Sequence, residues 1–175
     1  MRSIRTVLAL MVTFWALGMS DAVAKNVKIL DECDPATFNA PGRMLCDPNF
    51  DGGVTFQEFG SFLSPSAFGH PAWRFDAPFL EIQPSETLQV KNDGGEGHTF
   101  TEVPAFGGGR VGALNTPLGL TPRPECAVNL APIIDPGASV QLRGLGEGPH
   151  LFECCIHPWM HAVIHVQRGN NPGNQ

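Results

Sequence analysis

Three side chains that bind soft metal ions follow one another at three-residue intervals near the C-terminus. Cys154, His157 and Met160 offer a thiolate, an imidazole and a thioether. Soft sulfur ligands favour copper, and two histidines with one cysteine in a trigonal plane plus a distant axial methionine form an electron-transfer copper site. The segment therefore predicts copper and requires a second histidine. His98 follows a glycine-rich turn far upstream, so we expect it to come from a different strand and to point inward.

Strand alternation selects between the two adjacent cysteines. If residues 150–154 form a strand, Phe152 and Cys154 point to one face, and Leu151, Glu153 and Cys155 point to the other. With Phe152 in the core, Cys154 faces inward as the metal ligand. Cys155 is then left for a disulfide or for burial as a small apolar side chain.

The elements that must position these residues have the pattern of strands. Apolar and polar residues alternate over short runs separated by glycine and proline, at 79–82, 87–91, 99–103, 139–143, 150–154 and 162–167. In the last run, Ala162, Ile164 and Val166 should face one way and His165 the other. Short strands at this spacing predict an all-β sandwich or barrel.

From about Trp73 to Gln167 the chain resembles a cupredoxin, the blue copper fold of plastocyanin, amicyanin and azurin. The resemblance assigns His98, Cys154 and His157 as equatorial ligands and Met160 as the weak axial ligand, and the ligand spacing resembles the short loop of amicyanin. It implies a Greek-key β-sandwich and a single type 1 copper ion. It also implies one-electron transfer between redox proteins rather than enzymatic chemistry. Electrons are expected to pass through His157 if its outer edge reaches solvent.

Other functions fit parts of the pattern. A cysteine and a histidine separated by two residues can form half of a zinc site, but structural zinc normally takes four cysteine or histidine ligands. A copper-delivery protein, in which the metal is cargo, would need the same ligands. An extracellular interaction module stabilised by calcium is a third alternative, against which the intact copper ligands argue.

A second segment resembles the calcium-binding loop of an EF-hand. The pattern gives oxygen ligands in the order Asp47, Asn49, Asp51, the Gly53 carbonyl, Thr55 through water, and bidentate Glu58, with a glycine at the sharp turn. Pro41 and Gly42 interrupt the helix that should precede such a loop. The alternative is a glycine-rich turn whose polar side chains cap a short helix. The sequence leaves both interpretations open.

The chain has 175 residues, enough for one domain with an appendage. Residues 1–24 have the basic start, short apolar stretch and small-residue cleavage site of a secretory signal. Residues 25–71 are expected to form a small helical appendage, residues 72–168 the sandwich, and residues 169–175 a disordered tail. We expect a periplasmic or secreted protein with no membrane span after cleavage. If the signal is not cleaved, it becomes an N-terminal anchor.

Cleavage removes two of the 11 basic and one of the 17 acidic residues, which leaves a net charge of −7. No basic cluster is present that could neutralise phosphates, so nucleic-acid binding is not expected. Export also favours disulfides. With Cys154 reserved for copper, four cysteines remain and permit three pairings. We favour Cys33 with Cys46 and Cys126 with Cys155.

Overall fold

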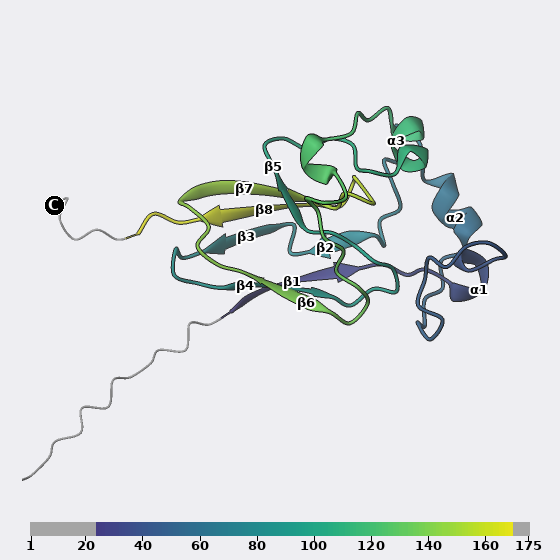
Figure 1. Cartoon of the computed structure of the whole chain (residues 1–175), viewed down its shortest axis with the longest axis horizontal. Coiled ribbons are helices and arrows are strands. Elements are labelled where there is room, and N and C mark those ends of the chain that lie inside the picture. Colours follow the sequence, from purple (N-terminus) through teal and green to yellow (C-terminus); the bar gives the residue numbers. More distant parts are fainter. Residues whose placement is uncertain (1–23, 170–175) are drawn as a thin grey trace, which may run out of the picture.

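The computed structural model describes residues 24–169, and Figure 1 shows the course of the chain. All but the last residue of the predicted signal and all but the first residue of the predicted tail lie outside the described residues. The elements follow in the order β1 (Lys25–Leu30), α1 (Pro35–Phe38), α2 (Phe56–Ser61), β2 (Arg74–Asp76), β3 (Phe79–Ile82), β4 (Leu88–Asn92), β5 (Thr101–Val103), α3 (Gly112–Leu118), the 3₁₀ helix η1 (Pro124–Cys126), β6 (Ser139–Leu142), β7 (Gly148–Glu153) and β8 (His161–Val166). None of the helices within residues 24–169 is long and apolar enough to cross a bilayer.

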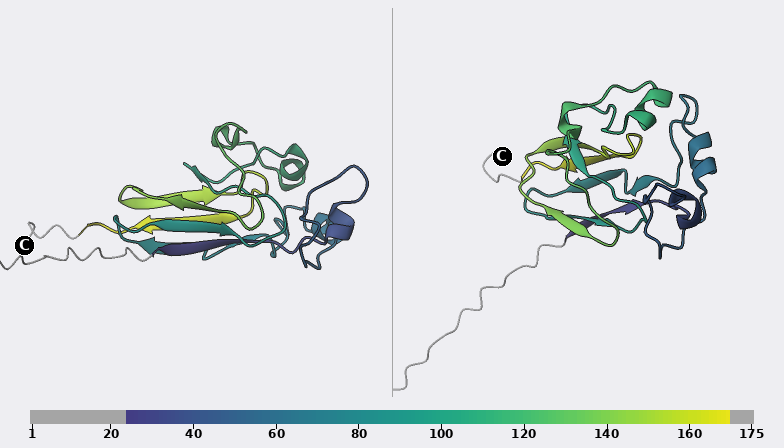
Figure 2. Two further views of the ribbon diagram at one scale, coloured as in Figure 1. Left: turned by 60° about the horizontal axis from the view of Figure 1, so that its bottom comes forward. Right: turned by 45° about the vertical axis from the view of Figure 1, so that its right-hand side comes forward.

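The strands form two four-stranded sheets that lie in separate layers (Figure 2). One sheet has the order β2-β1-β4-β6 and the other the order β3-β8-β7-β5. Each contains one parallel pair, β1 with β4 and β3 with β8, among otherwise antiparallel neighbours. The predicted fold class, an all-β sandwich with a small helical appendage, is confirmed.

Period-two alternation explains which side chains fill the space between the sheets. In β8, Ala162, Ile164 and Val166 are buried, while His165 is half-buried on the opposite face, as the sequence predicted. In β4, Leu88 and Val90 are fully buried. A one-residue slip in either strand would turn its apolar set to solvent, so burial fixes the register.

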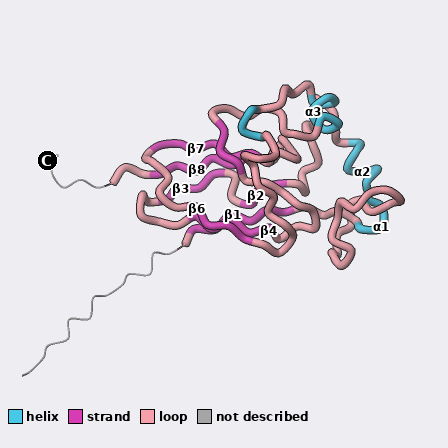
Figure 3. The backbone as a smooth tube through the Cα atoms, in the orientation of Figure 1, coloured by secondary structure: helices cyan, strands magenta, loops and turns pink. Residues whose placement is uncertain are grey.

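The helical appendage lies at one end of the sandwich, where α1 and α2 sit beyond the strand ends (Figures 1 and 3). Each helix begins at a polar cap: Asp34 accepts a hydrogen bond from the Ala36 amide, and Thr55 accepts one from the Glu58 amide. An aromatic cluster joins the appendage to the sandwich. The ring of Trp73 lies 5.7 Å from that of Phe38 and 4.7 Å from that of Phe59, measured between centroids.

The predicted N-terminal boundary of the sandwich, at residue 72, is wrong. Residues 25–30, placed in the appendage from the sequence, form β1 and pair with β2 and β4 in the first sheet. Val27 and Ile29 alternate with polar residues and are fully buried, which is the strand pattern. Two alternating apolar positions are too short a signal to outweigh the polar character of the following segment.

The Cys33–Cys46 disulfide should contribute strongly to the stability of the appendage. It closes a loop across a sequence separation of 13 residues, which predicts a loss of about 3 kcal/mol of unfolding free energy when both cysteines are replaced by serine. Denaturant unfolding of the double variant measures this. An unchanged unfolding free energy would mean that the aromatic cluster holds the appendage without the disulfide.

Candidate metal centre

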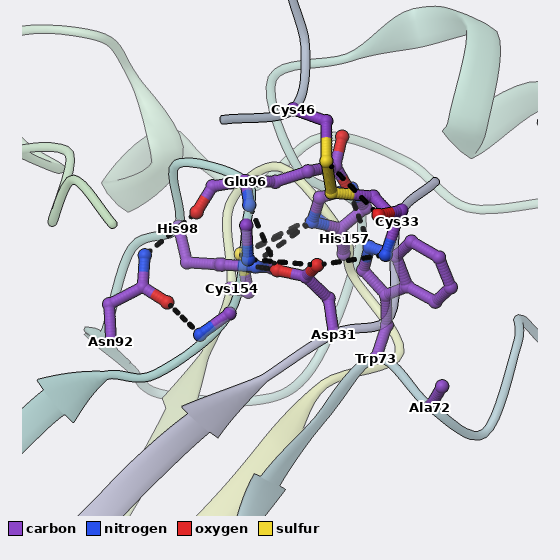
Figure 4. Close-up of polar contacts among 12 residues, drawn as sticks. Asp31, Cys33, Cys46, Ala72, Trp73, Asn92, Glu96, His98, Cys154 and His157 are labelled. Atoms are coloured by element: carbon purple, nitrogen blue, oxygen red, sulfur yellow. Dashed lines mark hydrogen bonds and ion pairs between the residues drawn. A yellow bond between two sulfur atoms is a disulfide. The ribbon is translucent and has the colours of Figure 1, made fainter. Parts of the chain in front are cut away.

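Three predicted ligands meet at the end of the sandwich nearest the appendage (Figure 4). His98 follows the turn after β4 and is held by two backbone hydrogen bonds with Ile134, at 3.2 and 2.7 Å. Cys154 directly follows β7, and His157 lies in the loop between β7 and β8. His98 is 56 positions from Cys154 and 59 from His157 in the sequence. The three residues meet because the ends of the two sheets lie together.

The three ligand atoms form a nearly regular triangle. The Sγ atom of Cys154 lies 3.7 Å from Nδ1 of His98 and 4.0 Å from Nδ1 of His157, and the two Nδ1 atoms are 3.3 Å apart. A point about 2.1 Å from all three atoms lies inside this triangle, which matches metal bonds of about 2.0–2.3 Å to nitrogen and sulfur. The donor set fits a single ion with trigonal coordination.

Met160 is placed by the same loop. Its backbone amide donates to the His157 carbonyl at 3.0 Å, and its carbonyl accepts from the Cys154 amide at 3.1 Å. The side chain is 1 % exposed. These contacts fold residues 154–160 into a compact loop, and axial ligation by the Met160 sulfur stays a prediction.

A buried carboxylate holds the outer nitrogen of His98. Nε2 of His98 lies 2.8 Å from Oδ2 of Asp31, and both side chains are fully buried. Asp31 also accepts hydrogen bonds from the amides of Cys33, Gly95 and Glu96. With Nε2 bound to Asp31, Nδ1 is the nitrogen left to face Cys154.

A second carboxylate holds His157 in the same way. Nε2 of His157 lies 3.3 Å from Oε2 of Glu96. The indole nitrogen of Trp73 donates to the same Glu96 oxygen at 2.5 Å. Both histidines therefore present Nδ1 to the cysteine because a carboxylate occupies Nε2 on each. The roles of Asp31, Glu96 and Trp73 in the site were not predicted from the sequence. The position of Glu96 in the turn two residues before His98 was the available signal.

These contacts shift the ionisation of the metal-free site. Burial opposes charge on His157, but the charge of Glu96 and the hydrogen bonds with Cys154 and Glu96 outweigh it and raise the pKa of His157 to about 10. Burial also favours the neutral Cys154 thiol, yet hydrogen bonds with His157 and His98 hold its pKa well below the usual range. The pKa of His98 is raised despite burial, chiefly by its hydrogen bond to Asp31. All three shifts favour a thiolate beside imidazolium rings in the metal-free site.

The outer edge of His157 does not reach open solvent. The side chain is 3 % exposed and packs against Phe59, Trp73 and Trp159, whose ring centroids lie 5.4–6.3 Å from that of His157. Phe59 belongs to α2 of the appendage. Electrons were expected to pass through His157 if its outer edge reached solvent. The appendage covers this edge, so that requirement is not met.

The remaining cysteines are paired as the sequence analysis favoured. Disulfides join Cys33 to Cys46 and Cys126 to Cys155, and Cys154 is the free cysteine among residues 24–169. The Cys155 amide donates to Thr99 Oγ1 at 2.7 Å. Cys155 thus ties the ligand strand to η1 and to the His98 segment, while Cys154 faces the metal position.

The EF-hand-like loop does not assemble a cation site. The carboxylates of Asp47, Asp51 and Glu58 are not gathered within 4.8 Å of one another. Asp47 instead accepts from the Asn49 amide in a local turn, and Glu58 lies 3.7 Å from Nε2 of His70. Thr55 caps α2. The turn-and-cap interpretation describes this loop, and the structure gives no support to calcium at Gly53 or its neighbours.

Comparison with known proteins gives structural likenesses alone. No family model matches the sequence, and no curated protein matches it. A purple cupredoxin from Nitrosopumilus maritimus is 14 % identical, with a TM-score of 0.43, over 82 % of this chain and 99 % of that one. An oxidised proline-to-glycine mutant of amicyanin is 13 % identical, with a TM-score of 0.40, over 88 % and 90 %. A copper-containing nitrite reductase from Thermus scotoductus SA-01 is 18 % identical, with a TM-score of 0.38, over 55 % of this chain and 20 % of that one.

Replacing Asp31 by asparagine should weaken metal binding about 10- to 100-fold, because the partner of the ligand His98 loses its charge. Glu32→Gln is the matched control, since it removes the same charge from the adjacent, exposed residue. Competition with a chelator of known affinity measures both. Equal affinities for the two variants would show that the Asp31 carboxylate does not support the site.

Metal affinity should rise with pH up to about pH 10. The metal-free site retains the proton of His157, whose pKa is about 10, and a bound metal ion must displace it from Nδ1. One displaced proton increases the apparent affinity about tenfold per pH unit. Calorimetry in buffers of different ionisation enthalpy counts the protons released. Release of none at pH 7 would contradict the assigned ionisation.

Proposed function

We propose that this chain binds one copper ion through His98, Cys154, His157 and Met160 and carries single electrons. The observation that carries the proposal is the triangle formed by two Nδ1 atoms and one Sγ atom at 3.3, 3.7 and 4.0 Å. The metal supplies the change between Cu(II) and Cu(I). The protein supplies the fixed ligand positions and excludes water.

The donor set favours copper over zinc. A thiolate with a buried thioether following it in the same loop is a soft combination, and two imidazoles complete the trigonal set that copper takes in electron-transfer sites. Zinc sites of structural type take four nitrogen or sulfur ligands. The nearest described acidic groups, Asp31 and Glu96, are engaged with the outer nitrogens of the histidines.

Rigidity and burial support electron transfer rather than substrate chemistry at the metal. Each of the three ligand side chains is at most 3 % exposed. The carboxylate contacts to Nε2, the backbone bonds of the ligand loop and the neighbouring disulfide restrict their movement. A site that keeps its geometry in both oxidation states needs little reorganisation when an electron moves.

The wider assignment follows from the sequence and this chemistry. We infer an exported protein in the periplasm or outside the cell, in agreement with two disulfides. Its redox partner is a protein or small molecule that tolerates an acidic surface, because the predicted mature chain carries a net charge of −7. Steering between charged partners weakens as salt concentration rises.

Copper-loaded protein should show intense visible absorption from thiolate-to-copper charge transfer and a reversible one-electron wave. Cys154→Ser should lose both, because it removes the thiolate. His165→Asn is the control, since His165 lies on the face of β8 opposite the core and should leave the spectrum unchanged. Absorption spectroscopy and voltammetry measure the two properties. Colourless wild-type protein would overturn the proposal, and rapid transfer of Cu(I) to a chelator without a reversible wave would favour copper delivery.

A further inference from the structure

An apolar cavity of about 330 Å³ lies between the appendage and the metal centre. Phe38, Phe56 and Phe59 from α1 and α2 line one side, and Leu114 of α3 lies on the other. The cavity also reaches His157, the ligand that the appendage covers. Its volume is at the lower end of the range for small-molecule sites and suits a single substituted ring.

Two side chains give this cavity its polar chemistry. Of the twelve residues that line it, Glu96 and His157 alone carry polar side chains. Both Nε2 of His157 and the indole nitrogen of Trp73 lie against Oε2 of Glu96. Glu96 retains 6 % exposure, and no donor among residues 24–169 is hydrogen-bonded to its other oxygen, Oε1. A ligand that donates a hydrogen bond would therefore find an acceptor in an otherwise apolar space.

The walls define the rest of the ligand. Three phenylalanine rings favour a flat aromatic group, which packs edge-to-face or offset against them. The carboxylate of Glu96 and the apolar lining disfavour an anion, because His157, the lining residue that can carry positive charge, already faces Glu96. A neutral ring with a hydroxyl group meets both conditions.

We propose that this cavity binds a small phenol or hydroquinone, with its ring among the phenylalanines and its hydroxyl donating to Glu96. Resting on the proposed electron-carrier function, we further assign such a molecule as an electron donor that reaches the metal centre through the His157 ring. In one step a hydroquinone would give one electron to Cu(II), reducing it to Cu(I), and would pass its hydroxyl proton to the Glu96 carboxylate that accepts the hydrogen bond. It leaves as the neutral radical with one O–H bond broken.

The binding claim can be tested without electron transfer. The reduced, copper-loaded protein is titrated with 4-ethylphenol and with 4-ethylanisole, which has the same ring but no hydroxyl hydrogen, while NMR signals of Ile156 and Leu114 are followed. The phenol should bind about tenfold or more tightly, because the anisole cannot donate to Glu96. Equal affinities, or no shift with either probe, would overturn the assignment.

A cavity-filling variant locates the binding. Ala113 lines the cavity and is exposed, so Ala113→Trp should block it without disturbing the core. Thr116→Trp is the control on the same helix, because Thr116 is exposed and does not line the cavity. The first should lose phenol binding at least tenfold and the second should keep it. Loss in both, or in neither, would place the phenol elsewhere.

Kinetics separate this inference from the proposed function. Reduction of the Cu(II) protein by hydroquinone should saturate with concentration in the wild type and lose saturation in Ala113→Trp. Reduction by an inorganic outer-sphere reductant should be the same in both. Normal inorganic reduction with unsaturable hydroquinone kinetics would overturn the donor assignment and leave the electron carrier standing. Failure of reduction by both reagents would overturn the electron carrier, while phenol binding to metal-free protein would still test the cavity.

Discussion

Two buried carboxylates, each bonded to the outer nitrogen of a histidine, determine how the metal centre is built. Asp31 and Glu96 occupy Nε2 of His98 and His157, and this directs both Nδ1 atoms to the sulfur of Cys154. Burying two acids is unfavourable unless cationic partners and hydrogen bonds compensate. His98 and His157, whose pKa values are raised, supply that compensation in the metal-free protein, and a copper ion bound to the same rings would supply it in the loaded protein. Metal binding and the stability of this end of the fold are therefore coupled.

The rest of the structure can be understood from what these carboxylates require. Asp31 directly follows β1, so pairing of β1 within the first sheet sets its position. The turn before His98 must approach Asp31 closely, and a Cβ atom at Gly94 would collide with the Asp31 carboxylate. Glycine at this position thus allows the amides of Gly95 and Glu96 to donate to Asp31. The appendage completes the site from the other side, because Phe59 of α2 covers His157. Trp73, at the junction of the appendage and the sandwich, anchors Glu96.

The metal ligands could be predicted from the sequence where the spacing of the ligand residues agreed with the alternation of a strand. The spacing of Cys154, His157 and Met160 predicted the loop, and alternation in β7 separated Cys154 from Cys155, which the structure places in a disulfide. Asp31 could not be found in this way, because a single acid after a short strand has no distinguishing pattern and its role depends on a residue 67 positions away. The EF-hand-like spacing failed for the related reason that a linear pattern does not specify where side chains turn. Burial of His157 depends on packing of the appendage, which spacing does not encode.

We propose that one copper ion lies within the triangle of His98, Cys154 and His157. A crystal structure of the copper-loaded protein, with anomalous scattering recorded at the copper absorption edge, would locate that ion. A single strong peak bonded to both Nδ1 atoms and to Sγ is expected, with Asp31 and Glu96 still at the two Nε2 atoms. A peak bonded to Nε2 of either histidine, or copper bound elsewhere with Cys154 unligated, would contradict it.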